Sequence, residues 1–256
     1  SWSVATQACR LASNGADFVQ AVADRTGLKL DIIEPEREAR LAVAGCMPLI
    51  NQDVDRALVF DIGGGSTELI WLDVSGKTPQ IIDLISLEVG VVTLTEQYAG
   101  MGEHGLGHVD VSQDSYDAMI AQVERCMQPF ADKYATDQGT DGHKVQVLGT
   151  SGTVTTLAGV YLGLPRYDRN KVDGVWMPQQ AILDISQKLS VMPYSERIKQ
   201  PCIGKERGDL VVAGCAILEA ICAAWPTDQV RVADRGLREG MLIELMAAAD
   251  RDDRPT

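Results

Sequence analysis

The hydrophobic pattern in the middle of the chain predicts a β-hairpin. Apolar, β-rich residues occupy 58–60 and again 69–72, and both runs have the length of a strand. Between them, residues 63–66 have the sequence Gly-Gly-Gly-Ser, a composition typical of a tight turn. A further apolar run at 81–90 predicts a third strand next to the hairpin.

Helical spacing of apolar residues is clearest after Ser112, which we expect to cap a long helix. Its apolar positions recur every three or four residues: Tyr116, Met119, Ile120, Val123, Met127 and Phe130. Such a stripe predicts a helix packed on a core. The same analysis predicts other helices at 14–27, after Pro35, after residue 153, at about 178–190, at 209–223 and in the C-terminal stretch "GLREGMLIELMAAA". It predicts further strands at 28–33, 144–149 and 229–234. The glycines of residues 100–113 predict a loop.

The order of these elements indicates the fold class. From residue 57 onward, three meandering strands are followed by helix, strand, helices, strand and helix. Alternating strands and helices of this kind form α/β layers, and this order is that of a ribonuclease-H-like lobe. We therefore expect an α/β protein built around such a lobe.

The turn at 63–66 is the first candidate for a binding site. Consecutive glycines allow backbone N–H groups to converge on one anion. Asp61 and Glu68 flank the turn, and two carboxylates there could hold a hard cation such as Mg²⁺ beside a phosphate. An ordinary glycine-rich hairpin is the alternative. A P-loop or a Rossmann motif fits poorly, because no Gly-Lys-Ser/Thr follows and the turn leads into a strand.

Two further turns lie between a strand and a helix. Residues 150–153, Thr-Ser-Gly-Thr, precede a helix whose first N–H groups lack partners within the helix, so they could bind an anion. Asp234 and Arg235 lie in the corresponding turn of "VADRGLREGML". A capped turn without a ligand is the alternative for both. In open α/β sheets, ligands gather at such strand ends.

Composition and charge narrow the functional classes. With 256 residues and 45% hydrophobic content, the chain is of a soluble globular type with one large core or two lobes. No apolar run is long enough to cross a bilayer and no signal-like segment opens the sequence, so we expect a cytoplasmic protein without a membrane partner. The six cysteines lack metal-ligand spacing and are expected to be reduced, mostly buried thiols.

The formal net charge of −13 excludes a general affinity for nucleic acid, which depends on clustered Lys and Arg. It does not exclude a phosphate substrate. A polyanion that approaches an acidic protein is repelled, so it would need metal ions and a few well-placed arginines near the site.

Several blocks of sequence resemble the exopolyphosphatase/guanosine pentaphosphate phosphatase (Ppx/GppA) family. In chain order they are "VATQACRLASNGADFVQAV", "IIEPEREARLAVAG", "VFDIGGGSTELI", "SLEVGVVTLTE", "LGTSGTVTTLAG", "ERGDLVVAGCAILEAI" and "DRGLREGML". The resemblance covers nearly the whole chain. It implies the actin-like ATPase fold with two ribonuclease-H-like lobes, residues 1–50 being the C-terminal part of the first and 51–256 the second. It also implies a site in the cleft between lobes.

The resemblance further implies Mg²⁺-dependent hydrolysis of a terminal phosphoanhydride, in the context of the bacterial stringent response, and it is compatible with a homodimer. Glu38 matches the catalytic glutamate that activates water, and Arg10 matches an arginine that faces the phosphates. Asp61 and Glu68 match acids that bind the metal or water, Asp61 also taking part in catalysis. The phosphate-binding residues implied are Gly63, Gly64, Gly65 and Ser66 in one turn and Ser151, Gly152 and Thr153 in the other. Since a base acts only near its proton, Glu38 is expected across the cleft from the first turn.

The sequence departs from the family pattern in two places. Family members open with an Asp-x-Gly-Ser hairpin that has no counterpart here, and we therefore expect the chain to be part of a longer one. Many members carry Arg where Thr93 stands. The substrate is expected to be inorganic polyphosphate, with guanosine pentaphosphate as the alternative. Two alternatives belong to functional classes other than hydrolases. One is an actin-like nucleotide-binding module or kinase, and the other is a regulatory protein without hydrolysis.

Overall fold

A computed structural model of the protein describes residues 2–76, 78–98, 101–102, 105–106, 110–134 and 144–252. Contacts divide the chain into two compact units, Ser1–Pro48 with Arg235–Thr256, and Leu49–Asp234. The sequence analysis had grouped 235–256 with the second lobe. The C-terminal helix instead packs on a helix of the N-terminal region, and so it belongs to the first unit.

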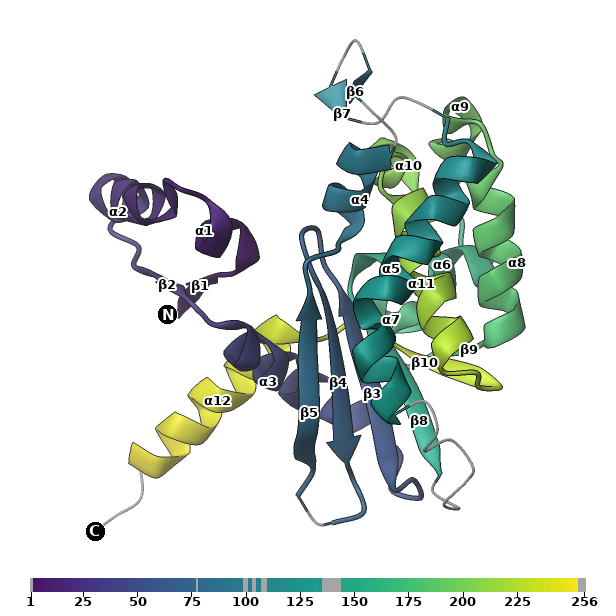
Figure 1. Ribbon diagram of the computed structural model, residues 1–256. Helices are drawn as coiled ribbons and strands as arrows, with labels where there is room; N and C mark the ends of the chain where they lie inside the picture. The colour runs from purple at the N-terminus through teal and green to yellow at the C-terminus, as the bar shows by residue number, and fades with distance from the viewer. Residues whose placement is uncertain are drawn as a thin grey trace. The chain divides into compact units, whose positions relative to one another are not determined.

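The second unit contains a six-stranded mixed sheet (Figure 1). Its strands are β3 (Arg56–Ile62), β4 (Thr67–Asp73), β5 (Gln80–Leu87), β8 (Val145–Thr150), β9 (Trp176–Pro178) and β10 (Gln229–Ala233). The order is β5-β4-β3-β8-β10-β9, with β3, β8 and β10 parallel and the β3-β4-β5 meander antiparallel. This is the topology of the predicted ribonuclease-H-like lobe, so the α/β class and the hairpin at 57–73 are confirmed.

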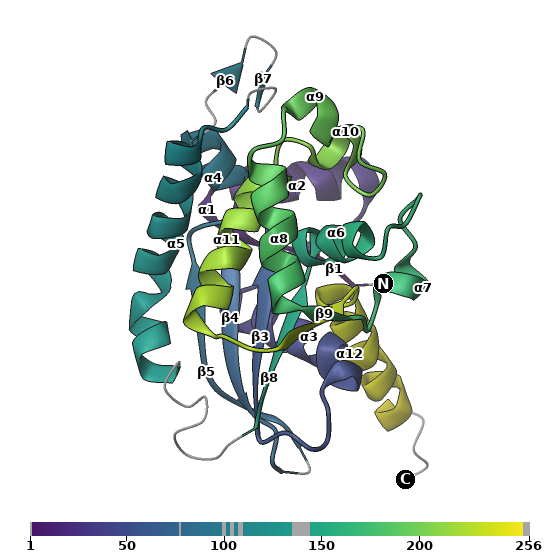
Figure 2. The same cartoon turned by 90° about the vertical axis from the view of Figure 1, so that its right-hand side faces the viewer.

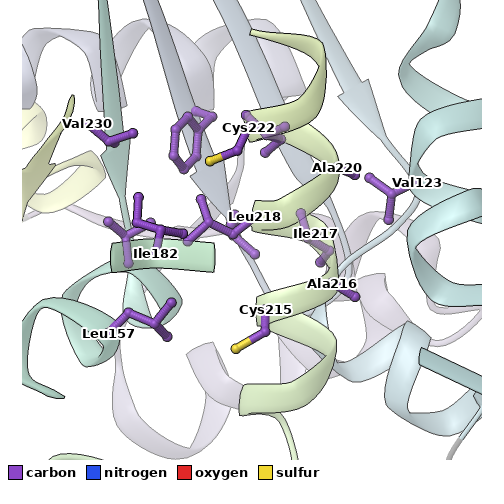
Figure 3. Packing of buried hydrophobic residues seen from close by; sticks show 14 of the residues in the cluster. Val123, Leu157, Ile182, Cys215, Ala216, Ile217, Leu218, Ala220, Cys222 and Val230 are labelled. Atoms are coloured by element: carbon purple, nitrogen blue, oxygen red, sulfur yellow. The ribbon is translucent and has the colours of Figure 1, made fainter. Parts of the chain in front are cut away.

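Helices cover the sheet of this unit (Figure 2). They are α4 (Val91–Tyr98), α5 (Gln113–Tyr134), α6 (Gly152–Tyr161), α7 (Arg169–Val172), α8 (Gln179–Ser190), α9 (Tyr194–Arg197), α10 (Gly204–Arg207) and α11 (Val211–Ala224). The predicted apolar stripe of α5 packs into the core, with only Ile120 partly exposed. Figure 3 shows Leu218 of α11 beside Ile182 of α8 in the same core. In the predicted loop at 100–113, the described residues include the short strands β6 (Met101–Gly102) and β7 (Gly105–Leu106).

The helix α4 was not expected from the sequence. Its first residues, Val91, Val92 and Thr93, are β-branched and favour strands by local propensity. In the structure the hydroxyl of Thr93 accepts a hydrogen bond from the N–H of Gly90 at 2.8 Å, which caps the helix start. The cap and the tertiary contacts of α4 therefore outweigh the local strand preference.

The first unit contains two parallel three-residue strands and four helices in its described part. They are β1 (Ser3–Ala5), α1 (Gln7–Leu11), α2 (Gly15–Thr26), β2 (Leu30–Ile32), α3 (Pro35–Cys46) and α12 (Leu237–Asp252); a 3₁₀ turn, η1 (Met47–Leu49), follows α3. The helix α2 ends at Gly27 with φ 74°, as the glycine predicted. A Cβ on Gly240 would lie 1.9 Å from the carbonyl oxygen of Leu41, so only glycine allows α12 to approach α3 so closely.

Four of the six cysteines are buried, Cys9 is partly buried and Cys126 is exposed, and none forms a disulfide. This agrees with the expected reduced thiols. Within the described residues, no helix has both the length and the apolar composition needed to span a membrane.

Candidate functional site

Two of the predicted phosphate-binding turns lie at one cavity of the second unit. The strands β3 and β8 are parallel neighbours, so the turns that follow Ile62 and Thr150 emerge at the same edge of the sheet. A cavity of about 280 Å³ opens there, and residues from both turns line it: Gly63 and Gly64 from the first, Ser151, Gly152 and Thr153 from the second. The sequence treated the turns as separate candidates, and the sheet brings them together.

The first turn is held by the N-terminus of α4. The N–H groups of Val91 and Val92 donate to the carbonyl oxygens of Gly63 and Gly64 at 3.0 and 2.8 Å. In a planar trans peptide the N–H points opposite to the carbonyl, so the N–H groups of Gly64 and Gly65 point away from α4. Two successive N–H groups that point the same way form an anion-binding nest.

The second turn contains a strained residue. Ser151 has φ 81° and ψ −178°, a conformation found almost only in glycine. It directly precedes α6, and its carbonyl oxygen accepts the N–H of Thr155 at 3.3 Å. The N–H groups of Gly152 and Thr153 belong to the first helical turn, where no intrahelical acceptor is available. The helix N-terminus thus adds outward-facing donors and a partial positive charge at the cavity wall.

Arg207 also lines the cavity, and the sequence analysis assigned it no role. It lies at the end of α10, and one guanidinium nitrogen donates to the carbonyl oxygen of Gly152 at 2.9 Å and to the hydroxyl of Thr156. A Cβ on Gly152 would lie 3.7 Å from the guanidinium carbon, so the guanidinium lies against this glycine. The only sequence signal was the position of Arg207 within the block "ERGDLVVAGCAILEAI".

Asp61 and Glu68 lie opposite each other on β3 and β4. Glu68 is buried and accepts a hydrogen bond from the Ser86 hydroxyl at 2.8 Å. Side chains alternate along a strand, so both carboxylates lie on the face of the sheet opposite to Ile62, and neither lines the cavity. The structure therefore places these two acids together near the turn, but not with the cavity-lining residues.

The carboxylate pair fits the requirements of Mg²⁺. Cross-strand partners such as Asp61 and Glu68 have Cβ atoms only about 5 Å apart. Mg²⁺ is usually held by one or two carboxylates together with water and substrate phosphates, not by an all-protein cage. The described residues contain no cluster of three or more His, Cys, Asp or Glu side chains suited to a metal ion.

Arg10 and Glu38 lie together in the first unit. Both terminal nitrogens of Arg10, on α1, donate to one carboxylate oxygen of Glu38, on α3, at 3.0 and 3.1 Å. The two side chains are 13% and 16% exposed, so water screens this ion pair only in part. The residues predicted to face the phosphates and to activate water therefore form one pair.

The third predicted turn is engaged with protein groups. Asp234 accepts a hydrogen bond from the phenol of Tyr167 at 2.5 Å and lies 3.8 Å from the Arg169 guanidinium. Burial and the contact with Asp234 raise the pKa of Tyr167 to about 12, so the phenol keeps its proton near neutral pH. This turn does not line the cavity.

Comparisons with known proteins show the family and the fold of the chain. The model of the Ppx/GppA phosphatase family matches residues 2–249. The chain is similar to the crystal structure of an exopolyphosphatase-like protein, with 25% identity, a TM-score of 0.83, and 96% of this chain and 77% of that one covered. It is similar also to a Ppx/GppA family member from Aquifex aeolicus, with 26% identity, a TM-score of 0.76, and coverage of 99% and 75%.

An exopolyphosphatase from Cytophaga hutchinsonii shares the fold at 21% identity, with a TM-score of 0.81 and coverage of 96% of this chain and 75% of that one. The family match spans nearly the whole chain and contains both turns of the cavity, Arg207 and the Arg10–Glu38 pair. This protein belongs to the Ppx/GppA phosphatase family.

Proposed function

We propose that this protein is an exopolyphosphatase, which hydrolyses the terminal phosphoanhydride of inorganic polyphosphate and releases orthophosphate. The observation that carries the proposal is that residues of both turns, at 63–64 and 151–153, line one cavity together with Arg207. Phosphoryl transfer depends mostly on positioning and charge neutralisation, and these groups can supply both.

The cavity-lining groups have distinct roles in the proposal. The N–H groups of the two turns bind the oxygens of the terminal phosphate, and Arg207 adds a fixed positive charge. Ile62, Val91 and Leu210 contribute apolar walls. Such walls exclude water and strengthen each electrostatic contact with the phosphate, because the local dielectric constant falls.

Asp61 and Glu68 are the proposed ligands of Mg²⁺ or another divalent cation. When bound there, the cation would add positive charge beside the first turn, on the face of the sheet opposite to Ile62. Glu38 is the proposed general base for the attacking water, on the strength of its place in "EREARL". Arg10 orients the Glu38 carboxylate through the two hydrogen bonds at 3.0 and 3.1 Å, and also contacts the phosphates in this proposal.

The walls of the cavity are our reason for proposing polyphosphate, in preference to guanosine pentaphosphate, as the substrate. Its lining residues are aliphatic, glycine, hydroxyl or arginine residues, and no aromatic side chain of the described chain is among them. A purine base commonly stacks on an aromatic ring in protein sites, whereas a linear phosphate chain needs no such ring. Guanosine pentaphosphate is the alternative substrate of the same hydrolytic site.

The test is the release of orthophosphate from long-chain polyphosphate and from guanosine pentaphosphate, with and without Mg²⁺. We expect release that requires Mg²⁺, is faster with polyphosphate, and falls at least about a hundredfold in Glu38→Gln, because a general base contributes 10²–10⁴-fold. Glu36→Gln, an exposed acid on the same helix, is the matched control and should keep full activity. No release from either substrate would overturn the hydrolase and favour a nucleotide-binding or regulatory protein.

A further inference from the structure

The cavity arginine is carried by a very short helix. Arg207 is the last residue of α10, which has four residues and begins at Gly204 with φ 64°. A single helical turn has little stability of its own, because nucleation costs more than one turn of hydrogen bonds returns. The position of Arg207 must therefore depend on contacts with the rest of the unit.

A second arginine supplies such a contact from below the surface. Arg197, at the end of α9, is 1% exposed. Its Nε donates to the carbonyl oxygen of Gly208 at 2.8 Å, and one terminal nitrogen donates to the carbonyl oxygen of Met192 at 2.9 Å. One rigid guanidinium therefore connects the residue that follows Arg207 to the segment that precedes α9.

The packing at Gly208 leaves little freedom for this connection to shift. A Cβ on Gly208 would lie 2.5 Å from a side-chain methyl of Ile198 and 3.3 Å from the ring of Tyr194. The N–H of Gly208 also donates to the carbonyl oxygen of Gly204 at 3.0 Å, which closes the turn of α10. A displacement of Arg197 would therefore displace the end of α10.

Two opposing effects act on the pKa of the Arg197 guanidinium. Burial lowers its pKa, while the nearby carboxylates of Asp110 and Asp209 act in the opposite direction. A buried charge costs desolvation free energy, so it is not by itself evidence of a stabilising contact. The planar fork of arginine, however, bonds two separate carbonyl groups in fixed directions, which the point charge of lysine does not reproduce.

We propose that Arg197 is a positioning residue that holds Arg207 against Gly152 and so sets the affinity of the cavity for the phosphate groups of the substrate. The proposal rests on the proposed function of the cavity. Arg197 itself does not line the cavity, so its effect on binding must pass through Arg207.

The test is a double-mutant cycle on the full-length protein. Arg197→Lys, Arg197→Met, Arg207→Gln and the two double variants are compared for binding of inorganic tripolyphosphate by calorimetry and for KM and kcat of phosphate release. We expect both Arg197 variants to weaken binding and raise KM about tenfold, within the range for directly coupled residues. In the Arg207→Gln background, the same Arg197 changes should have no further effect.

Tyr116→Phe is the matched stability control. It removes a partly buried hydrogen bond of 2.5 Å to Glu219, and neither residue lines the cavity. It should lower thermal stability while leaving tripolyphosphate binding unchanged. Two results would overturn the positioning role alone. In one, the Arg197 changes weaken binding equally with natural Arg207 and with Arg207→Gln. In the other, the Arg197 changes leave binding unchanged with natural Arg207. Unchanged binding in Arg207→Gln would overturn the proposed site as well, so the two failures are distinguishable.

Discussion

Ser151 occupies a backbone conformation that costs the protein stability. Among the non-glycine residues that the structure describes, Ser151 alone has a positive φ, at 81°. Such a conformation costs about 1–3 kcal/mol and tends to persist where function requires it. Ser151 lies between β8 and α6 and lines the cavity. We therefore propose that the strained conformation orients the second turn toward the cavity.

Replacement of Ser151 by glycine should separate this strain from function. We expect Ser151→Gly to raise the free energy of unfolding by about 1 kcal/mol relative to Ser151→Ala, because glycine adopts this φ without a Cβ penalty. Urea unfolding measures the difference. Both variants lose the hydroxyl, so both should release phosphate more slowly. Equal stabilities of the two variants would show that the residue is not strained.

At the scale of elements, α4 and the hairpin turn depend on each other. A Cβ on Gly90 would lie 2.4 Å from the carbonyl oxygen of Gly64, a distance that real structures do not show. A side chain at position 90 would therefore displace the backbone at the point where the N–H groups of Val91 and Val92 donate to the turn. The N–H groups proposed to bind phosphate are thus oriented by a helix that the local sequence does not predict.

Gly90→Ala is therefore expected to damage binding more than folding. The overpacked contact should cost about 1–3 kcal/mol of stability, and a turn displaced by about 1 Å should lower kcat/KM about a hundredfold. Gly76→Ala in the turn after β4 is the control, since its nearest contact would be 3.8 Å and it should keep its activity. Phosphate release and thermal unfolding of both variants check this. Normal activity in Gly90→Ala would contradict the dependence of the turn on α4.

At the scale of the whole molecule, a half-buried carboxyl group links stability to pH. Burial raises the pKa of Glu219 on α11 above its ordinary value of 4.5, although the hydrogen bond from Tyr116 acts in the opposite direction. A group whose pKa is raised by folding contributes stability below its unfolded pKa. That contribution is lost as the pH rises through the folded pKa.

Glu219→Gln should therefore gain stability relative to the natural protein as the pH rises above 4.5. The amide keeps an acceptor for Tyr116 and carries no charge to be desolvated. Urea unfolding at pH 4.5 and pH 8 measures the change, with Glu96→Gln on an exposed position of α4 as the control. If the difference in free energy of unfolding between Glu219→Gln and the natural protein does not grow with pH, the raised pKa of Glu219 is contradicted.

The sequence by itself determined the elements whose signals are local. The hairpin followed from two apolar runs around glycines, the burial of α5 from its 3.6-residue stripe, and the end of α2 from Gly27. The glycine and hydroxyl composition of both cavity turns was equally visible. These features were predictable because each depends on backbone conformations and side chains within a few residues of one another.

Only the tertiary structure decided how such parts combine. The β-branched start of α4 becomes helical because its N–H groups bind the carbonyl groups of the hairpin turn. The helix α12 joins α3 of the first unit through glycines that allow close approach, although about 190 residues separate them. Arg207 and Arg197 have no local signal, since their roles come from Gly152 and Gly208. Contacts between distant segments form only when the chain folds, and for that reason periodicity and turn composition do not contain them.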